Sequence, residues 1–359
     1  MTPPVWAETI CDLPVAIARH YRAMGRLRRQ APLRRPKVST VAGSNDTDPT
    51  APEIQRIQDA YVTPRGGFFD GTLSPVLSYD PDRLSDDPWW VAWSGFTPPT
   101  EQSPRIERAV YCGSFWGDNY YHWLIEAACR VAVAEDHIRA SRLPVVTTSG
   151  AHAYQTASLS FLFPDLEFLP VQSHGMRIDR CEFMPFDPHQ PDRVAEAARR
   201  LRELSRQRLP QSPKLIRRAL WIDRTEGNRV FRPSRLGFHQ KIQALGYEMV
   251  NPANLSFVDQ VRIHSQARVI AGPHGAAFTN MLWAPEGCRV IEIAHATYQP
   301  SYYASLATAL DHEHQRIICQ PALRFLGKLL RQGQANTMPI KLTQTEEDRL
   351  LHVLAEAAS

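Results

Sequence analysis

In the second third of the chain, short apolar runs alternate with stretches in which apolar residues recur at helical spacing. This pattern predicts strands that alternate with helices. Short apolar runs predict buried strands at 109–116, 143–149 and 166–171. Apolar residues at helical spacing predict helices at 119–140 and 153–163. Strands and helices that alternate in this way indicate βαβ units and a parallel sheet.

A second alternating series follows a charged, amphipathic helix predicted over 191–209, which could bridge two halves of the molecule. In this series Ser234 and Ser256 are expected N-caps, and Asp259 stands at a capping-box position. The elements predicted after residue 210 are strands at 218–224, 247–252, 268–272 and 289–294, and helices at 234–246, 256–267, 301–311 and from Gly275 onward. We therefore expect an α/β protein with two Rossmann-like domains and a cleft.

The expected division of the chain follows the two series. The predicted parts are a basic arm and linker at 1–60, a first α/β domain at 61–210, a second at 211–320 and a tail or helix at 321–359. The arm carries seven arginines and one lysine between residues 19 and 37. Such a segment could touch anionic lipid at the inner membrane, or it could be a solvated basic arm.

Composition narrows the class of protein. The chain has 359 residues, of which 43% are hydrophobic and 22% charged, as in globular proteins. Its net charge of +4 is too small to argue for nucleic acid, but it suits an anionic ligand. The six cysteines lack C-x-x-C spacing, which favours reduced thiols over disulfides or zinc. No signal-peptide pattern or membrane-length apolar run is present, so we expect a cytoplasmic location.

The stretch VIAGPHGAAFTN, at 269–280, carries the first candidate chemistry. A strand ends at a His-Gly pair and a helix begins there, and strand ends are where open α/β sheets bind ligands. The helix dipole and the first backbone N–H groups would favour an anion. The alternative is a structural histidine in a tight turn. The candidate contacts are the side chains of His274, Thr279 and Asn280 and the backbone of Gly275, Ala276, Ala277 and Phe278.

Arginines follow a second strand end in the same series. Arg224 stands at the end of the predicted strand, and Arg229 and Arg232 lie in the loop beyond it. Because the guanidinium fork matches phosphate oxygens, these side chains could clamp a diphosphate. A solvated loop with Glu226 paired to Arg229 is the alternative.

The third group of residues lies in the helix predicted at 119–140. His122, Glu126 and Arg130 recur every four residues and therefore share one face, and Asn119 lies one turn before His122. A histidine that is oriented by a carboxylate can act as a general base. The alternative is a Glu126–Arg130 salt bridge beside a half-buried histidine.

Together these blocks resemble glycosyltransferase family 61, also known as DUF563. The motifs are the NYYHWLIE…R helix at 119–130, the strand end from Ile222 to Arg229, and the block from Leu255 to Ile293 that contains HGA, TN and VIEI. One departure is Ala277, where many members have glycine. Bacterial members are usually described as capsule or exopolysaccharide proteins.

The resemblance implies a GT-B fold, a UDP-sugar held by the C-terminal domain, inversion at the anomeric carbon and no metal. A DxD motif at a strand end is indeed lacking. We therefore expect a glycosyltransferase that needs no cofactor and acts on a nucleotide sugar and a glycan or glycolipid acceptor. A non-catalytic nucleotide-sugar scaffold and a peripheral membrane adaptor are the rival hypotheses.

Residue roles follow from the same expectation. Arg224, Arg229 and the 274–280 corner would hold the diphosphate, and His122 or Glu126 would be the base, with Asn119 and Arg130 on the acceptor side. Glu292 would meet ribose, or else be a buried structural carboxylate. Tyr298, Tyr302 and Tyr303 could stack on a sugar or base, or form an aromatic cluster.

Overall fold

A computed structural model gives the fold for residues 39–40, 54–71, 76, 99–187, 190–210, 217–224, 230–296, 298–319 and 339–359. The chain has an α/β fold with parallel sheets, and it divides into two compact units that are interleaved along the sequence. Unit 1 comprises Met1–Gly117, Asp136–Gly150 and Leu166–Phe186. Unit 2 comprises Asp118–Glu135, Ala151–Asp165 and Asp187–Ser359.

Unit 1 is built on a mixed sheet, whose described strands have the order β1-β2-β7-β4-β5-β6, with β3 paired to β2. Strands β7, β4, β5 and β6 are mutually parallel, whereas β2 runs antiparallel to its neighbours. The strands are β1 Ser39–Thr40, β2 Gln55–Val62, β3 Phe68–Phe69, β4 Arg105–Tyr111, β5 Val145–Thr147, β6 Phe168–Pro170 and β7 Met176–Phe183. The linker expected up to residue 60 therefore ends earlier, because β2 already pairs with β7 from Gln55 onward.

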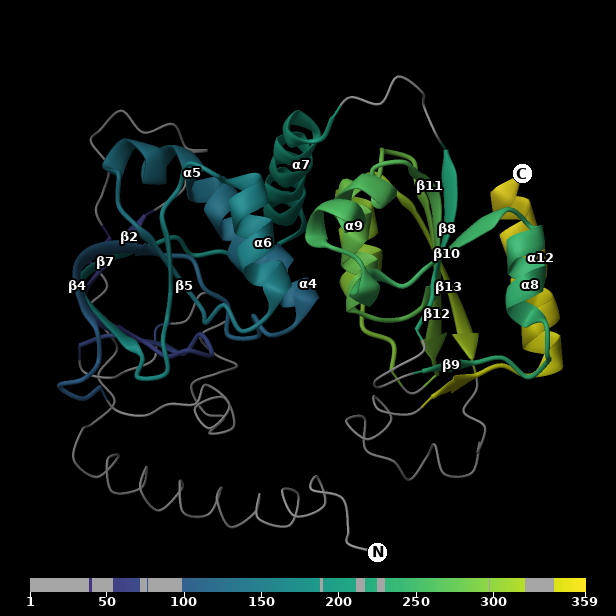
Figure 1. Cartoon of the computed structure of the whole chain (residues 1–359), viewed down its shortest axis with the longest axis horizontal. Helices are drawn as coiled ribbons and strands as arrows, with labels where there is room; N and C mark the ends of the chain where they lie inside the picture. The colour runs from purple at the N-terminus through teal and green to yellow at the C-terminus, as the bar shows by residue number, and fades with distance from the viewer. Residues whose placement is uncertain are drawn as a thin grey trace, which may run out of the picture. The chain divides into compact units, whose positions relative to one another are not determined.

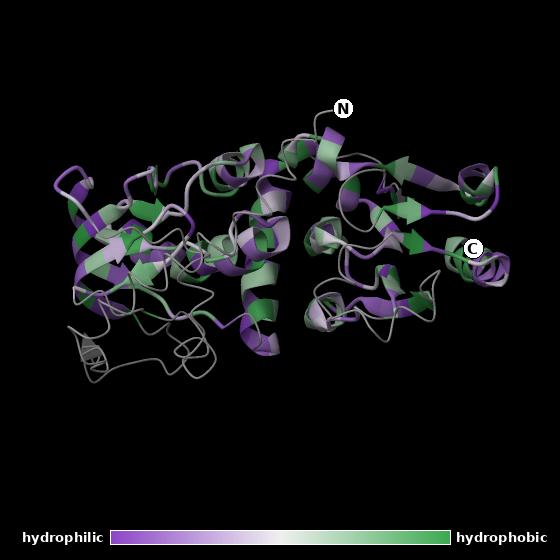
Figure 2. Ribbon diagram, turned by 90° about the horizontal axis from the view of Figure 1, so that it is seen from below, coloured by the Kyte–Doolittle hydropathy of each residue, from purple (hydrophilic) through white to green (hydrophobic). Residues whose placement is uncertain are grey.

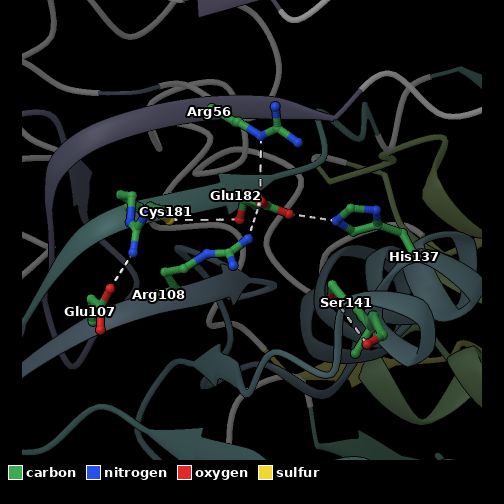
Figure 3. A network of polar contacts seen from close by, with 9 residues as sticks. Arg56, Glu107, Arg108, His137, Ser141, Cys181 and Glu182 are labelled. Carbon is green, nitrogen blue, oxygen red and sulfur yellow. Dashed lines mark hydrogen bonds and ion pairs between the residues drawn. The ribbon is translucent and has the colours of Figure 1, made fainter. Parts of the chain in front are cut away.

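A buried carboxylate of β7 links this strand to three other elements. Glu182 of β7 accepts hydrogen bonds from Arg56 of β2 and Arg108 of β4, each at 3.4 Å, and contacts Nε2 of His137 at 2.6 Å (Figure 3). His137 lies on helix α5, Cys129–Ser141. Burial would raise the pKa of Glu182, but the bond to His137 and the positive charges around it outweigh burial and lower that pKa. The network joins the sheet to α5.

Unit 2 is built on a fully parallel sheet with the strand order β10-β8-β11-β12-β13 in the described residues. These strands are β8 Arg218–Ile222, β10 Tyr247–Val250, β11 Ala267–Pro273, β12 Arg289–His295 and β13 Glu313–Cys319. The three central strands are almost continuously buried. Such runs are typical of a parallel sheet with helices on both faces, and Figure 1 shows α9 on one face and α8 and α12 on the other.

The helices of unit 2 include two short forms that the sequence pattern does not distinguish from α-helix. One is a π-helix, η1, and the others are 3₁₀ helices, η2 and η3. The bounds are α4 Tyr120–His122, η1 Trp123–Ala128, α6 Ala153–Leu162, α7 Pro191–Arg208, α8 Phe238–Ala244, η2 Pro252–Asn254, α9 Phe257–His264, η3 Ala276–Trp283, α10 Tyr302–Ala309 and α12 Gln344–Ala358. A short parallel pair, β9 Phe231–Arg232 and β14 Ile340–Lys341, completes the unit.

Helix α12 packs on the sheet of unit 2, so the segment expected as a tail contributes to the core. Leu350, Leu354 and Ala357 recur on one face of the helix and are buried against the sheet cluster. Figure 2 shows hydrophobic and hydrophilic residues alternating around the helix that bears the C-terminus. Arg268 and Arg289 donate to the last carbonyls of α12, where cations also complement the helix dipole.

Most of the strands and helices predicted between residues 109 and 311 are confirmed, but α8 is shorter than expected. It begins at Phe238 rather than near Ser234, because Gly237 at its N-cap has φ +80° and breaks the helical path. The N–H of Ser234 instead donates to the buried Glu347. The basic segment 19–37 lies outside the described residues. None of the described helices has the length and apolarity to cross a bilayer.

Candidate active site

The corner between β11 and η3 forms as the sequence predicts, but with a tighter helix. His274 donates its backbone N–H to Ile293 at 2.8 Å, which ties the corner to β12. Phe278 donates to the carbonyl of Gly275 at 3.0 Å and closes the first 3₁₀ turn. Three backbone N–H groups were expected to face an anion, and that of Phe278 is instead bonded within the helix. The N–H groups of Ala276 and Ala277 precede the first helical bond, and both residues are half-buried.

Arg224 follows β8 and lies directly over Gly275. Its Nη1 donates to the carbonyl of His274 at 3.2 Å. A Cβ atom on Gly275 would meet this Nη1 at 2.0 Å, so only glycine leaves room for the guanidinium. A second glycine brings the two strands together: Gly272 has φ +153°, and a Cβ there would lie 2.6 Å from the carbonyl of Ile222. Cationic and helix-terminal groups thus share one edge of the sheet.

Glu292 of β12 is a fully buried carboxylate that holds three basic side chains. It pairs with Nδ1 of His274, with Nε2 of His314 at 2.9 Å and with Nε of Arg316 at 2.9 Å. Burial would raise the pKa of Glu292, but the bonds from both histidines and the charge of Arg316 lower it to about 2. A carboxylate that is ionised at neutral pH therefore lies behind the corner.

This environment decides between the two interpretations of Glu292. Both of its oxygens are bonded to side chains and it has no exposed surface, so the buried structural carboxylate is favoured over a ribose contact. The carboxylate at Nδ1 also fixes the orientation of the His274 ring.

Arg316 extends the same network to a loop. Besides Glu292, it donates to the carbonyl of Pro300 at 2.6 Å and to that of Gln299 at 3.4 Å. This loop carries Tyr298, whose ring centroid lies 5.4 Å from that of His274. His314 and Arg316 were not predicted from the sequence. The sequence does show that they alternate with Glu313 and Gln315 and so share one face of a strand. It does not show that this strand pairs with β12, which carries Glu292.

His122 and Glu126 form the pair that their spacing predicts. Nδ1 of His122 lies 2.5 Å from Oε1 of Glu126, and the Glu126 side chain is 3% exposed against 23% for His122. The pair spans the junction of α4 with the π-helix η1. Single π turns in α-helices are frequent at functional sites. The buried Glu126 orients the ring, and Nε2 of His122 is the atom that can face a substrate.

Asn119 and Arg130 take structural positions that differ from the expected acceptor contacts. Asn119 is the N-cap of α4, and its side chain accepts the N–H of Tyr121 at 2.9 Å. Arg130 is only 1% exposed, so its guanidinium is an interior group. The π turn between Glu126 and Arg130 changes the helical register on which a common face was predicted.

Thr279 and Asn280 also point into the interior, because η3 packs against α4 and α9. Both are fully buried. The amide oxygen of Asn280 accepts from Tyr120 at 2.7 Å and from Trp283 at 3.1 Å, and its NH₂ group donates to Gln260 at 2.9 Å. The expected phosphate contact of Asn280 is thus replaced by a link that fixes α4 to η3.

Tyrosine rings connect the two histidine–carboxylate pairs within unit 2. Tyr303 lies 5.1 Å from His274 and 5.7 Å from Tyr121, which in turn lies 5.2 Å from His122, all between ring centroids. Tyr302 lies 6.3 Å from His122. Tyr302 and Tyr303 thus belong to an aromatic cluster, which is one of the two alternatives expected for them, and the buried Tyr121 is part of it as well.

Arg229 lies outside the described residues, and Arg232 is an exposed residue of β9. Among the residues that the structure describes, no group of three or more His, Cys, Asp or Glu side chains is placed to hold a metal ion. Metal independence stays a prediction.

Comparison with known families bears on this geometry. Residues 120–291 match the family model Glycosyltransferase 61. The match supports assignment to glycosyltransferase family 61. It includes His122, Glu126, Arg224 and His274, and it supports glycosyltransferase activity in glycan synthesis. No curated protein matches the chain at a significant level.

Proposed function

We propose that the protein is an inverting, metal-independent glycosyltransferase that moves a sugar from a UDP-sugar to a hydroxyl of a glycan or glycolipid acceptor in polysaccharide synthesis. The observation that carries the proposal is the guanidinium of Arg224 lying over Gly275, at the start of η3 and beside His274. Two basic side chains thus lie at the N-terminus of a helix, and groups of this kind can stabilise a leaving diphosphate.

The residues on the donor side neutralise the negative charge that develops on the diphosphate as its bond to the anomeric carbon breaks. Arg224 offers a fixed positive charge, and the His274 side chain, held in place by Glu292, lies beside it. The N–H groups of Ala276 and Ala277 add donors from the backbone. These groups need no reorganisation during the reaction, which is how preorganised donors lower a barrier.

The acceptor side uses the His122–Glu126 pair. Nε2 of His122 takes the proton of the acceptor hydroxyl, and Glu126 holds the ring through Nδ1. The acceptor oxygen bonds to the anomeric carbon as the bond from that carbon to the diphosphate oxygen breaks, and UDP departs with the electron pair. One displacement inverts the centre and requires no covalent intermediate with the enzyme.

The proposal also covers organisation and location. We propose a GT-B arrangement in which unit 2 is the nucleotide-sugar domain, and a cytoplasmic enzyme of the capsule or exopolysaccharide type, with peripheral membrane contact through the 19–37 segment. The parallel sheet of unit 2, with its site at the carboxyl ends of β8 and β11, supports the nucleotide-sugar role.

Calorimetry with UDP in the presence and absence of EDTA tests the proposal. We expect micromolar to millimolar binding that EDTA leaves unchanged, and its abolition by EDTA would contradict metal independence. Hydrolysis of UDP-GlcNAc, UDP-xylose and UDP-galactose then tests catalysis. Binding of UDP without turnover of any donor, with any acceptor supplied, would favour the nucleotide-sugar scaffold instead.

A further inference from the structure

We propose that Asp118, His152 and Tyr154 form a subsite for the acceptor, and that it takes a neutral glycan chain. This inference rests on the proposed function and names the substrate class of the same site. None of the three residues was implicated by the sequence pattern. All three lie in unit 2, in the segments that flank α4 and open α6.

The subsite is an accessible aromatic platform. The rings of His152 and Tyr154 are parallel, with an interplanar angle of 4° and centroids 5.3 Å apart. The side chain of His152 is 47% exposed, and Tyr154 is half-buried. The C–H face of a pyranose carries a slight positive charge and packs on the negative faces of such rings. A stacked pair therefore suits a sugar ring.

A carboxylate stands at the edge of this platform. Asp118 lies 3.9 Å from Nε2 of His152, and its side chain is 55% exposed. Its charge also acts on Tyr154, whose pKa is raised by burial and then by Asp118. An exposed carboxylate can accept hydrogen bonds from sugar hydroxyls, which are uncharged. It repels uronic acids or phosphates, so the platform selects a neutral chain.

Contacts with Gln155 and Tyr120 fix the position of the platform. The buried Gln155 accepts the backbone N–H of His152 at 2.8 Å and donates its own N–H to the carbonyl of His152 at 3.0 Å. Tyr154 packs against Tyr120 in an edge-to-face contact with centroids 5.2 Å apart. Tyr120 is in turn fixed by its bond to Asn280. A preorganised surface loses little freedom on binding.

The position of the platform connects it to the proposed base. Tyr120 and His122 occupy the same single turn, α4, and Asp118 is four residues from His122. Four residues of chain span at most about 14 Å, so a glycan on the platform lies within a few sugar rings of His122. The acceptor hydroxyl would come from the terminal sugar, and the platform would hold a sugar further back.

Binding of the full chain to immobilised tetrasaccharides of glucose, xylose, mannose, N-acetylglucosamine and galacturonic acid tests this inference. We expect retention of one or more neutral members and not of the galacturonic acid one. Tyr154→Ala should weaken retention roughly tenfold, and Tyr154→Phe, which keeps the ring, by no more than about threefold. Asp118→Asn should weaken neutral binding and allow acidic binding. His352→Ala, at an exposed histidine of α12, is the matched control.

UDP affinity and the melting temperature of the same samples separate the outcomes. Unchanged UDP affinity with lost glycan binding supports the subsite. If the wild-type protein retains no member of the panel, or if Tyr154→Ala binds glycan as the wild type does, the subsite is wrong even when UDP binds. If UDP does not bind but retention depends on Tyr154, the proposed function fails, and the three residues form a glycan-binding surface with no acceptor role.

Discussion

Arg224 donates a hydrogen bond to the backbone carbonyl of His274, although fifty residues separate them in the sequence. The contact exists because β8 and β11 are parallel neighbours whose carboxyl ends meet at one edge of the sheet. It places a guanidinium above Gly275, where a side chain would collide with it. The proposed diphosphate site thus depends on a glycine as much as on a cation.

Gly275→Ala should weaken UDP binding roughly tenfold, because the added Cβ displaces Arg224 and its charge-assisted bonds are lost. The φ of Gly275 is 173°, an extended value that alanine adopts, so the melting temperature should change little. Calorimetry with UDP measures the effect. Gly246→Ala is the control: it should lower the melting temperature, because a φ of +87° strains alanine, and leave UDP affinity unchanged, because the added Cβ meets nothing within 4 Å. Equal UDP affinity in wild type and Gly275→Ala would contradict the arrangement.

His122→Ala should lower kcat by about 10²–10⁴ and leave UDP affinity near that of the wild type, because the ring acts on the acceptor hydroxyl. Glu126→Gln should have a smaller effect, roughly tenfold or more, since it disturbs the orientation of the ring. The pair His352–Glu356 has the same four-residue spacing on exposed α12, so His352→Ala and Glu356→Gln are matched controls. A loss of UDP affinity in His122→Ala would place the pair on the donor side.

Stability should fall in acid partly because of Glu292. Its pKa is lowered from 4.5 to about 2 in the folded state, so its stabilising effect is present above pH 4.5 and is lost as the pH falls toward 2. The full effect on the free energy of unfolding is roughly 3 kcal/mol. Glu292→Gln should therefore flatten the dependence of melting temperature on pH between 5 and 2. Glu356→Gln, at an exposed carboxylate, should not, and equal slopes in both variants would refute the assignment.

Arg316→Lys should affect turnover more than it affects UDP affinity. Lysine keeps a positive charge near Glu292 but cannot also reach the carbonyls of Gln299 and Pro300 with a planar fork. We expect UDP affinity within about threefold of wild type and a larger loss in turnover, because the tyrosine-bearing loop is released. Arg289→Lys, at an exposed ion pair on β12, is the control. A loss of UDP affinity alone would show that Arg316 acts only through His274.

The local elements could be predicted because they depend on short-range patterns. The strand periods from Arg218 to Ala294, the Ser256 cap of α9 and the His122–Glu126 spacing are all visible in a few residues of sequence. The β2 strand was not predicted, because its pairing with β7 joins segments more than a hundred residues apart.

The sequence by itself determined the alternation of strands and helices, the glycine at position 275 and the spacing of the His122–Glu126 pair, since each is a local feature. The tertiary structure alone decided which side chains face the corner. Thr279 and Asn280 follow Gly275 by four and five residues, yet both side chains are buried in the interior, while Arg224, His314 and Arg316 come from other strands. The physical reason is that a site at the end of a parallel sheet is assembled from strand ends that only hydrogen bonding between strands brings together.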